Sequence, residues 1–372
     1  MKRTTVEQHT ILLGIVGSHA YGLALPTSDV DVKGVCIAPI DYYYGLKEFY
    51  QKDGGWDDPH DAPSGLFPIL EGVQDCTIYE LRKFVGLAAN NNPSIMEMLW
   101  LKQYEYLDPG VGMDMVAHRD AFLSKKVKHT YSGYGFAQLK KVDTHRRWLL
   151  NPPLAMPQAK DYGIDDDHLP LTKSQMGAFL EYILVLTRDS IEFMEPVAQL
   201  RKLLLEDIDL TAIVKQKPLG IGVIPYIQQM TRGSEDFMHL LQRSQAYRKA
   251  MNEWDSYQHW KKGRNAERAA LEAKCGYDCK HAAHSVRLLR QGLECLQHKE
   301  LIVDRREAGD AEELLAIRQG EYSYEAVIEV TDALFIQLDE AYNTSTLPHG
   351  ADRELIHYLC AEWIQNYHYN NY

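Results

Sequence analysis

The stretch 11–37, ILLGIVGSHAYGLALPTSDVDVKGVCI, constrains the fold more than any other segment of the chain. Its beginning, 10–16, is a short, β-branched, apolar run that predicts a strand buried on both faces. Gly17 and Ser18 end this run, and a glycine permits a tight turn and close backbone approach. After a short helix and a turn, residues 29–38 alternate charged and apolar side chains and predict a second strand with one polar face in its first half.

The second strand carries two carboxylates in the pattern Asp-x-Asp. Residues two apart on a strand point to the same face, so Asp29 and Asp31 project together. Two like charges held this close favour a bound cation, and Mg²⁺ prefers carboxylates together with phosphate oxygens. Backbone N–H groups at the Gly17-Ser18 turn can bind the phosphates. The pattern predicts a nucleotide–metal site; the alternative is an exposed strand end with solvated carboxylates.

Length and charge set the next limits. The 372 residues are enough for two domains, and the formal net charge is -12. A chain this acidic binds nucleic acid only through a local basic patch. The segment 118–148 contains such a patch, in which aromatic side chains lie among the basic ones. The basic residues are Arg119, Lys125, Lys126, Lys128, Lys140, Lys141, Arg146 and Arg147. This segment is either an RNA-binding surface with stacking aromatics, with His145 adding to the acceptor contacts, or a packed helix pair with solvated lysines.

Neither a membrane span nor an export signal is expected. No apolar run approaches the roughly 20 residues that a span needs, and the basic start of the chain leads directly into the first predicted strand. The six cysteines are sparse for this length, which favours free thiols and a cytoplasmic location.

The predicted secondary structure changes near residue 110. Strand signals occupy the residues before it, interrupted by a Gly-, Pro- and Asp-rich segment at 50–68 that predicts a surface loop or flap. Amphipathic helical patterns follow, near 113–148, 172–207, 234–273, 277–299, 324–342 and 351–366. We therefore expect an α+β protein: a catalytic domain at 1–109 with a small mixed sheet and helices, and an all-α domain at 110–372 that binds substrate or nucleotide.

Gly17-Ser18 followed by Ser28-Asp29-Val30-Asp31 resembles the signature of the polymerase-β-like nucleotidyltransferase superfamily. The fuller text AYGLALPTSDVDVKGV is similar to the predicted nucleotidyltransferases associated with RNA-ligase repair operons, which also occur in phages. The resemblance extends over most of the chain, through YELRKFVGLAANNNPSIMEMLW, YGFAQLKK, KHAAHSVRLLRQGLE and AIRQGEYSYEAV.

The superfamily implies a third carboxylate on a neighbouring strand. Asp75 matches best, with Glu71 as the fallback on the same strand face. A charged residue in an otherwise apolar extended run is costly unless it serves a site, although Asp75 also fits a turn at the strand's end. The resemblance implies that Asp29 and Asp31 hold a nucleotide-bound Mg²⁺ or Mn²⁺. Asp31 and Asp75 would hold or deprotonate the attacking hydroxyl.

The same resemblance implies that Gly17, Ser18 and Ser28 hold the triphosphate. In the predicted helix 277–299, Lys280, His284, Arg287 and Gln291 share one face opposite an apolar face. This polar face is either solvated or a cationic wall over the phosphates, and the family motif supports phosphate contact for Lys280 and Arg287, with His284 beside them.

A zinc site formed by Cys275, Cys279, His281 and His284 is not favoured, because a continuous helix cannot turn all four side chains to one point. His281 lies to one side of the polar face and fits either a packed histidine or a member of the wall.

The implied function is metal-dependent transfer of a nucleoside monophosphate from an NTP to a hydroxyl, with release of pyrophosphate. The operon context of the family favours an RNA end, such as a tRNA, as acceptor. Two alternatives stay open: transfer of AMP to a protein or small molecule, as in toxin–antitoxin-like relatives, and a catalytically silent nucleotide- or RNA-binding module.

Overall fold

The computed structural model describes residues 1–54, 65–70, 73, 75–164, 170, 172, 235–264 and 266–371. Glu71, residues 55–64 of the loop expected at 50–68 and residues 173–207 of the helix expected at 172–207 lie outside the described residues. In the described part of the expected loop, Gln51–Asp53 form a strand instead. The chain divides into two compact units: Met1–Leu150 together with Ala270–Tyr372, and Asn151–Ala269.

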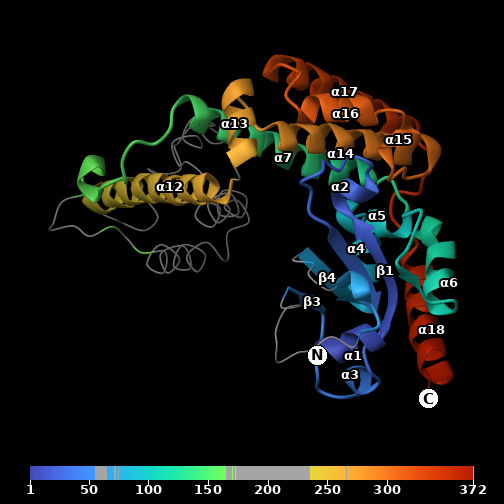
Figure 1. The fold of residues 1–372 in the computed structure, drawn as a ribbon. Coiled ribbons are helices and arrows are strands. Elements are labelled where there is room, and N and C mark those ends of the chain that lie inside the picture. Colours follow the sequence, from blue (N-terminus) through green and yellow to red (C-terminus); the bar gives the residue numbers. More distant parts are fainter. Residues whose placement is uncertain are drawn as a thin grey trace. The chain divides into compact units, whose positions relative to one another are not determined.

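The first unit is built on a five-stranded mixed sheet in the order β3-β4-β2-β1-β5 (Figure 1). The strands are β1 (Thr10–Val16), β2 (Asp31–Cys36), β3 (Gln51–Asp53), β4 (Asp75–Glu80) and β5 (Tyr106–Leu107). The β2–β4 pair is parallel and the other neighbours are antiparallel. The predicted α+β class is confirmed, and the described strands all precede residue 110.

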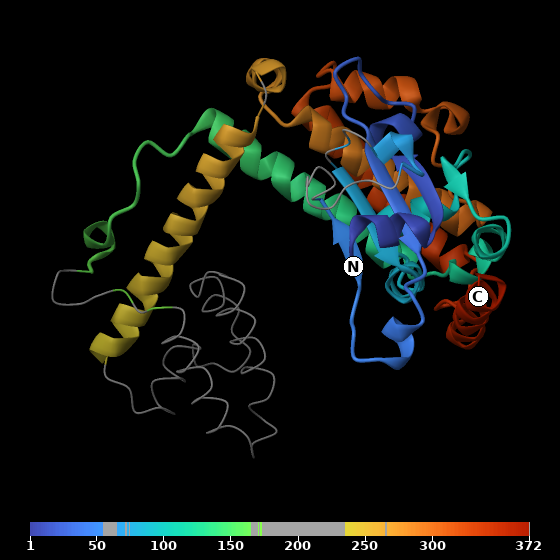
Figure 2. The same ribbon diagram turned by 60° about the horizontal axis from the view of Figure 1, so that its bottom comes forward.

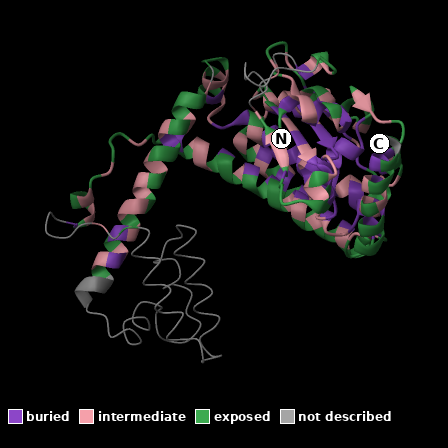
Figure 3. Cartoon of the chain, turned by 90° about the horizontal axis from the view of Figure 1, so that it is seen from below, coloured by how far each residue is buried: buried purple, intermediate pink, exposed green. Residues whose placement is uncertain are grey.

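Both faces of the sheet are buried, because alternate strand residues enter different cores. Leu12 and Val35 face a large core, which Phe84, Met96 and Trp363 complete. These three come from α4 (Leu81–Ala88), α5 (Pro93–Leu99) and α18 (Arg353–Asn371), and α6 (Val111–Ala117) joins them. The strands are largely buried in Figure 3, as predicted for β1.

The opposite face of the sheet has its own smaller core. Leu13, Val32 and Ile78 pack there against Val6 of α1 (Arg3–Gln8) and against Phe49. The short helix α3 (Asp41–Tyr44) follows β2 and contributes Tyr42 to the rim of this core. The sheet is thus fixed from both sides, which holds the ends of its strands in register.

Helices form a second layer, which Figures 1 and 2 show grouped together. Its main members are α7 (Val127–Leu150), α14 (Cys279–His298), α16 (Ala311–Arg318) and α17 (Tyr324–Thr344), with the short α15 (Arg305–Ala308) before α16. They share an apolar core that includes Val142, Val286, Leu289, Leu314 and Leu338. The predicted C-terminal all-helical region is therefore confirmed among the described residues. Its parts up to Leu150 and from Ala270 onward belong to the same compact unit as the sheet, whereas Asn151–Ala269 form the other unit.

The prediction of a single helix near 113–148 is wrong. α6 ends at Ala117, a short 3₁₀ helix, η2 (Arg119–Phe122), follows, and α7 begins at Val127. The buried side chain of Asn91 explains the break, since it donates to the carbonyl of Phe122 and accepts from the hydroxyl of Ser124. These tertiary hydrogen bonds replace the helical ones, so local periodicity alone could not reveal them.

The second unit is described over fewer residues. It contains a short 3₁₀ helix, η3 (Ala159–Tyr162), and the long helix α12 (Glu235–Gly263). Arg243 of α12 donates to the carbonyl of Gly163 at 3.0 Å, and the rings of Tyr162 and Tyr247 lie 5.7 Å apart. The helix expected at 234–273 is in fact two, because α13 (Ala266–Cys275) starts after α12 has ended.

Two further points concern the described residues as a whole. No helix among them combines the length and the apolar character needed to cross a membrane. The expected boundary separates a catalytic domain, 1–109, from a domain that binds substrate or nucleotide, 110–372. This boundary rests on the functions expected of the two parts, and it stays a prediction. Compactness instead groups the sheet with the helices from residue 270 onward.

Candidate active site

One end of the sheet brings three strand termini together. Val16, the last residue of β1, pairs with Asp31, the first residue of β2. Asp31 in turn pairs in parallel register with Asp75, the first residue of β4. Directly paired residues point to the same face of a sheet, so the two carboxylates lie side by side on neighbouring strands. Asp75 therefore occupies the position expected of a third carboxylate.

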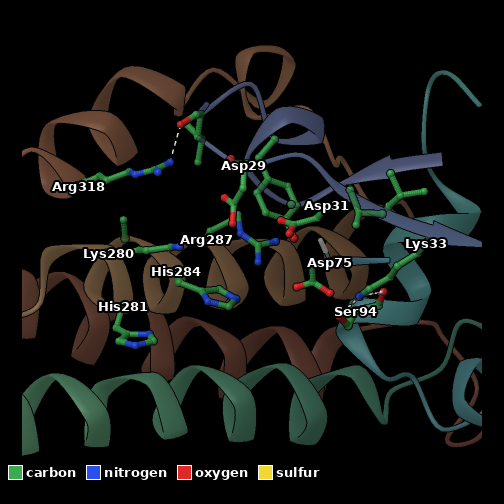
Figure 4. Close-up of a pocket in the computed structure, with 17 residues that line it drawn as sticks. Asp29, Asp31, Lys33, Asp75, Ser94, Lys280, His281, His284, Arg287 and Arg318 are labelled. Carbon is green, nitrogen blue, oxygen red and sulfur yellow. Dashed lines mark hydrogen bonds between the residues drawn. The ribbon is translucent and has the colours of Figure 1, made fainter. Parts of the chain in front are cut away.

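This end of the sheet opens into a cavity of about 290 Å³ (Figure 4). Its polar lining includes carboxylates from the sheet on one side and cations from the helices on the other. The lining residues with polar side chains are Ser18, Tyr21, Asp29, Asp31, Lys33, Asp75, Ser94, Lys280, His281, His284, Arg287 and Arg318. Every element that contributes to the cavity belongs to the first compact unit.

The electrostatics of the three carboxylates fit a bound divalent cation. Burial raises the pKa of Asp31, and the charges of Asp29 and Asp75 raise it further, whereas Lys280 and Lys33 act in the opposite direction. A folded-state pKa above the unfolded value means that ionising Asp31 at neutral pH costs stability. Oxygen ligands of this kind, carrying excess negative charge, are those that Mg²⁺ or Mn²⁺ prefers.

Gly17 fits closely against this carboxylate group. Its φ of +67° lies in the left-handed region that favours glycine. A Cβ at this position would collide with Oδ2 of Asp31. The glycine therefore allows the turn after β1 to pass directly beside the Asp31 carboxylate.

We expect Gly17→Ala to lower the rate of the nucleotidyl transfer implied by the sequence more than tenfold, because the added methyl must displace the Asp31 carboxylate. The strained φ alone costs about 1 kcal/mol. Gly309→Ala is the matched control, since Gly309 has a φ of +79° but nothing within 4 Å of an added Cβ. Equal losses of activity in the two variants, measured beside their thermal unfolding, would contradict the steric assignment.

The two serines have different positions. Ser18 lines the cavity within α2 (Gly17–Ala20), which begins at Gly17 without a side-chain cap. Ser28 is not among the lining residues. Its hydroxyl accepts hydrogen bonds from the backbone N–H of Leu25 at 2.9 Å and from Nη2 of Arg318 at 3.4 Å. Ser28 therefore contacts one cavity residue, Arg318, and its nucleotide contact stays a prediction.

The helix α14 brings Lys280, His284 and Arg287 to the cavity, and Figure 4 shows them opposite the aspartates. With Gln291, these residues form the predicted polar face of the helix. The two expected environments of this face were solvent and a cationic wall over the phosphates, and neither describes all four side chains. Arg287 and Gln291 are almost completely buried, so they do not belong to a solvated surface. Of these four side chains, only Lys280 is exposed.

Arg287 belongs to a buried polar group that we call the Glu97 cluster: Tyr21, Glu97, Arg287 and Gln291. Arg287 donates to Glu97 and, at 2.6 Å, to Gln291. The hydroxyl of Tyr21 donates to the other Glu97 oxygen at 2.6 Å, and the guanidinium lies 3.7 Å from the centre of the Tyr21 ring. Arg287 thus fixes α14 against α5 at the cavity wall, and its direct phosphate contact stays a prediction.

His284 is a neutral imidazole in this setting. Burial lowers its pKa well below the usual 6.5, and the charge of Arg287 lowers it further. A neutral imidazole offers one donor and one acceptor to a ligand in the cavity.

Sequence reasoning missed Lys33, Ser94 and Arg318. Lys33 donates to Oγ of Ser94 at 2.6 Å, and burial lowers the pKa of this lysine. Its position was detectable, because it follows Asp31 by two residues and so shares its strand face. Arg318, at the end of α16, donates to the carbonyl of Leu23 at 2.6 Å, and no local pattern marks it as a cavity residue.

The basic segment 118–148 is less available to a partner than its composition suggests. Lys126 donates to Asn90, Lys128 pairs with Asp339, and Arg146 stacks over the Tyr324 ring. Tyr131 of α7 is fully buried, in the same core as Leu288 and Cys295 of α14. These contacts favour the packed-helix interpretation, and RNA binding by this segment stays a prediction.

The comparisons with known proteins bear on the sheet and its carboxylates. Residues 2–149 match the RNA repair pathway DNA polymerase beta family, RlaP. This span includes Gly17, Asp29, Asp31 and Asp75, and within it the match confirms the resemblance inferred from the sequence. The resemblance of the motifs beyond residue 149 stays a prediction. No curated protein and no solved structure matches the chain. Residues 2–149 are thus similar to a polymerase-β-like family connected with RNA repair.

Proposed function

We propose that the protein transfers a nucleoside monophosphate from an NTP to a hydroxyl acceptor and releases pyrophosphate. The observation that carries the proposal is the register of Asp31 and Asp75, which start parallel neighbouring strands beside Gly17 and Asp29 in one cavity. Carboxylates on one side and cations on the other suit an anionic phosphate chain accompanied by a dication. The RlaP match supports the same class of reaction.

The residues divide by role. Asp29, Asp31 and Asp75 would hold Mg²⁺ or Mn²⁺, which supplies charge neutralisation for the phosphates and the attacking oxygen. Gly17, Ser18, Lys280 and Arg318 all line the cavity. The Gly17-Ser18 backbone would donate to phosphate oxygens, and Lys280 and Arg318 would provide positive charge for the triphosphate. These residues would orient the NTP so that its α-phosphorus faces Asp75.

The proposed step forms one bond and breaks another. The acceptor hydroxyl oxygen bonds to the α-phosphorus, while the bond from that phosphorus to the bridging β-phosphate oxygen breaks, and pyrophosphate leaves. The hydroxyl proton passes to a carboxylate oxygen, for which Asp75 is our candidate. Lys33, held by Ser94, would place a positive charge beside this carboxylate.

An RNA end, such as a tRNA terminus, is the acceptor that we propose, because the matching family is described as an RNA repair family. Transfer of AMP to a protein or small molecule is the second possibility, favoured by the net charge of -12, which disfavours nucleic acid overall. A reaction that uses NTP and RNA ends is expected in the cytoplasm.

The test is incubation of the purified protein with each α-³²P-labelled NTP and Mg²⁺ or Mn²⁺, first with total RNA and then with a protein extract. We expect label on RNA, absent from a parallel reaction with Asp75→Asn. Label only on protein would identify the second possibility. Absence of label from every acceptor, together with no pyrophosphate, would contradict transfer and favour a silent binding module.

A further inference from the structure

Beside the cavity, a fully buried carboxylate lies between two imidazoles. Asp278 precedes α14, and its Oδ2 lies 2.7 Å from Nδ1 of His145 on α7 and 3.7 Å from Nε2 of His281 on α14. The three ligand atoms lie within 4.8 Å of one another, and this is the one group of its kind among the described residues. It is distinct from the carboxylates of the sheet.

We propose that His145, Asp278 and His281 bind a transition-metal dication of the zinc class. Zinc is bound by imidazole nitrogen and carboxylate oxygen at about 2.0–2.2 Å, and its tetrahedral ligand atoms are about 3.3 Å apart. The two separations in the structure, 2.7 and 3.7 Å, lie on either side of that value. Small side-chain rotations therefore suffice to form the site, and two nitrogen ligands disfavour Mg²⁺.

The surroundings hold the three side chains in place. Nδ1 of His281 lies 2.8 Å from Oε1 of Gln138, and an amide oxygen can only accept, so this nitrogen donates. The neutral ring then carries its lone pair on Nε2, the atom that faces Asp278. A metal-binding histidine characteristically donates its other N–H to such a partner.

The other two ligands are equally constrained. His145 stacks on the ring of Trp148, with their centres 5.5 Å apart. Oδ1 of Asp278 accepts from the backbone N–H of His281 at 3.1 Å, which leaves Oδ2 directed at the imidazoles. All three side chains are at least mostly buried, so an ion here would be largely shielded from water.

The proposed ion would connect α7 to the first turn of α14. That turn carries Lys280, and His281 itself lines the cavity, so the ion would fix the position of the helix that supplies the cations. The positive charge of Lys280 repels the proposed ion, and the negative charge of the buried Asp278 offsets this repulsion. The site is independent of the proposed nucleotidyl transfer, and it requires no activity assay.

The experiment measures metal content by mass spectrometry, on protein prepared without a histidine tag, loaded with Zn²⁺ and freed of excess. All samples carry Asp29→Asn, Asp31→Asn and Asp75→Asn, which remove the carboxylate site. We expect about one zinc per chain, and an affinity at least about a hundredfold lower in His145→Ala/His281→Ala. The control His129→Ala/His298→Ala removes one exposed histidine from each of the same two helices and should keep the zinc.

Two measurements guard against a variant that fails to fold. Gln138→Leu leaves all three ligands in place and should lower zinc affinity about ten- to a hundredfold. Co²⁺ bound to the protein with intact histidines should show the visible absorption of nitrogen-ligated cobalt, and Zn²⁺ should abolish it. The proposal is wrong if that protein retains no more zinc than the double histidine variant, or if its cobalt spectrum matches that of the free ion.

Discussion

Asp31→Asn is expected to lower the rate of nucleotidyl transfer about a thousandfold or more while leaving the fold intact. Asp31 lies between Asp29 and Asp75, and Asn preserves its shape while removing the charge that holds the dication. Pyrophosphate release under saturating NTP and Mg²⁺ measures the effect. Asp41→Asn, which changes an exposed carboxylate paired with Lys47, is the control and should retain full activity.

The same variant makes a stability prediction with a definite sign. Burial and two neighbouring carboxylates raise the pKa of Asp31, so its negative charge destabilises the metal-free fold above that pKa. Metal-free Asp31→Asn should therefore unfold at the same temperature as the unchanged protein or a higher one at pH 7. Mg²⁺ should raise the unfolding temperature of the unchanged protein more than that of the variant. A variant that is inactive because it is unfolded would leave the catalytic role of Asp31 without support.

Glu97→Gln is expected to lower the free energy of unfolding by about 3–5 kcal/mol, because it leaves the buried guanidinium of Arg287 without its counter-charge. Both side chains of the pair are about 4% exposed, so water cannot replace the lost partner. Urea unfolding monitored by circular dichroism measures the change. Asp339→Asn, which breaks an ion pair whose aspartate is largely exposed, should cost at most about 1 kcal/mol.

A variant with three compensating substitutions shows whether the destabilisation comes from an unpaired buried charge or from a packing defect. Tyr21→Phe/Glu97→Leu/Arg287→Met replaces three members of the Glu97 cluster with apolar groups of similar size. Replacing a buried ion pair in this way is often neutral or stabilising, so this variant should be clearly more stable than Glu97→Gln alone. If Glu97→Gln costs less than about 1 kcal/mol, the cluster does not hold α14 against α5 in the way proposed.

The sequence revealed most of what depends on local pattern. The apolar run 10–16 became β1 with the predicted bounds. The strand expected at 29–38 is shorter, because β2 begins at Asp31 and ends at Cys36, so Asp29 precedes the strand and does not lie on it. The position of Asp75 came from the resemblance, and its register against Asp31 is visible only once β2 and β4 are paired. Strand periodicity, followed two residues beyond Asp31, also places Lys33 at the site.

Long-range partners explain what was missed. A helical wheel shows only that the face carrying Arg287 is polar, which suggests a phosphate wall, whereas its partner Glu97 lies 190 positions away in sequence. Arg318 reaches Leu23 across 295 positions, so no local pattern could place it at the cavity. The break between α6 and α7 depends in the same way on Asn91, 31 positions before the carbonyl that it binds.

The most direct test of nucleotidyl transfer compares two labels on the same NTP. With α-³²P, we predict that the label becomes covalently attached to the acceptor; with γ-³²P, we predict that it leaves only as pyrophosphate. Both signals should disappear together in Asp29→Asn/Asp31→Asn. Transfer of the γ label to an acceptor would indicate a kinase, and retention of both labels in intact NTP with every acceptor would contradict the proposed function.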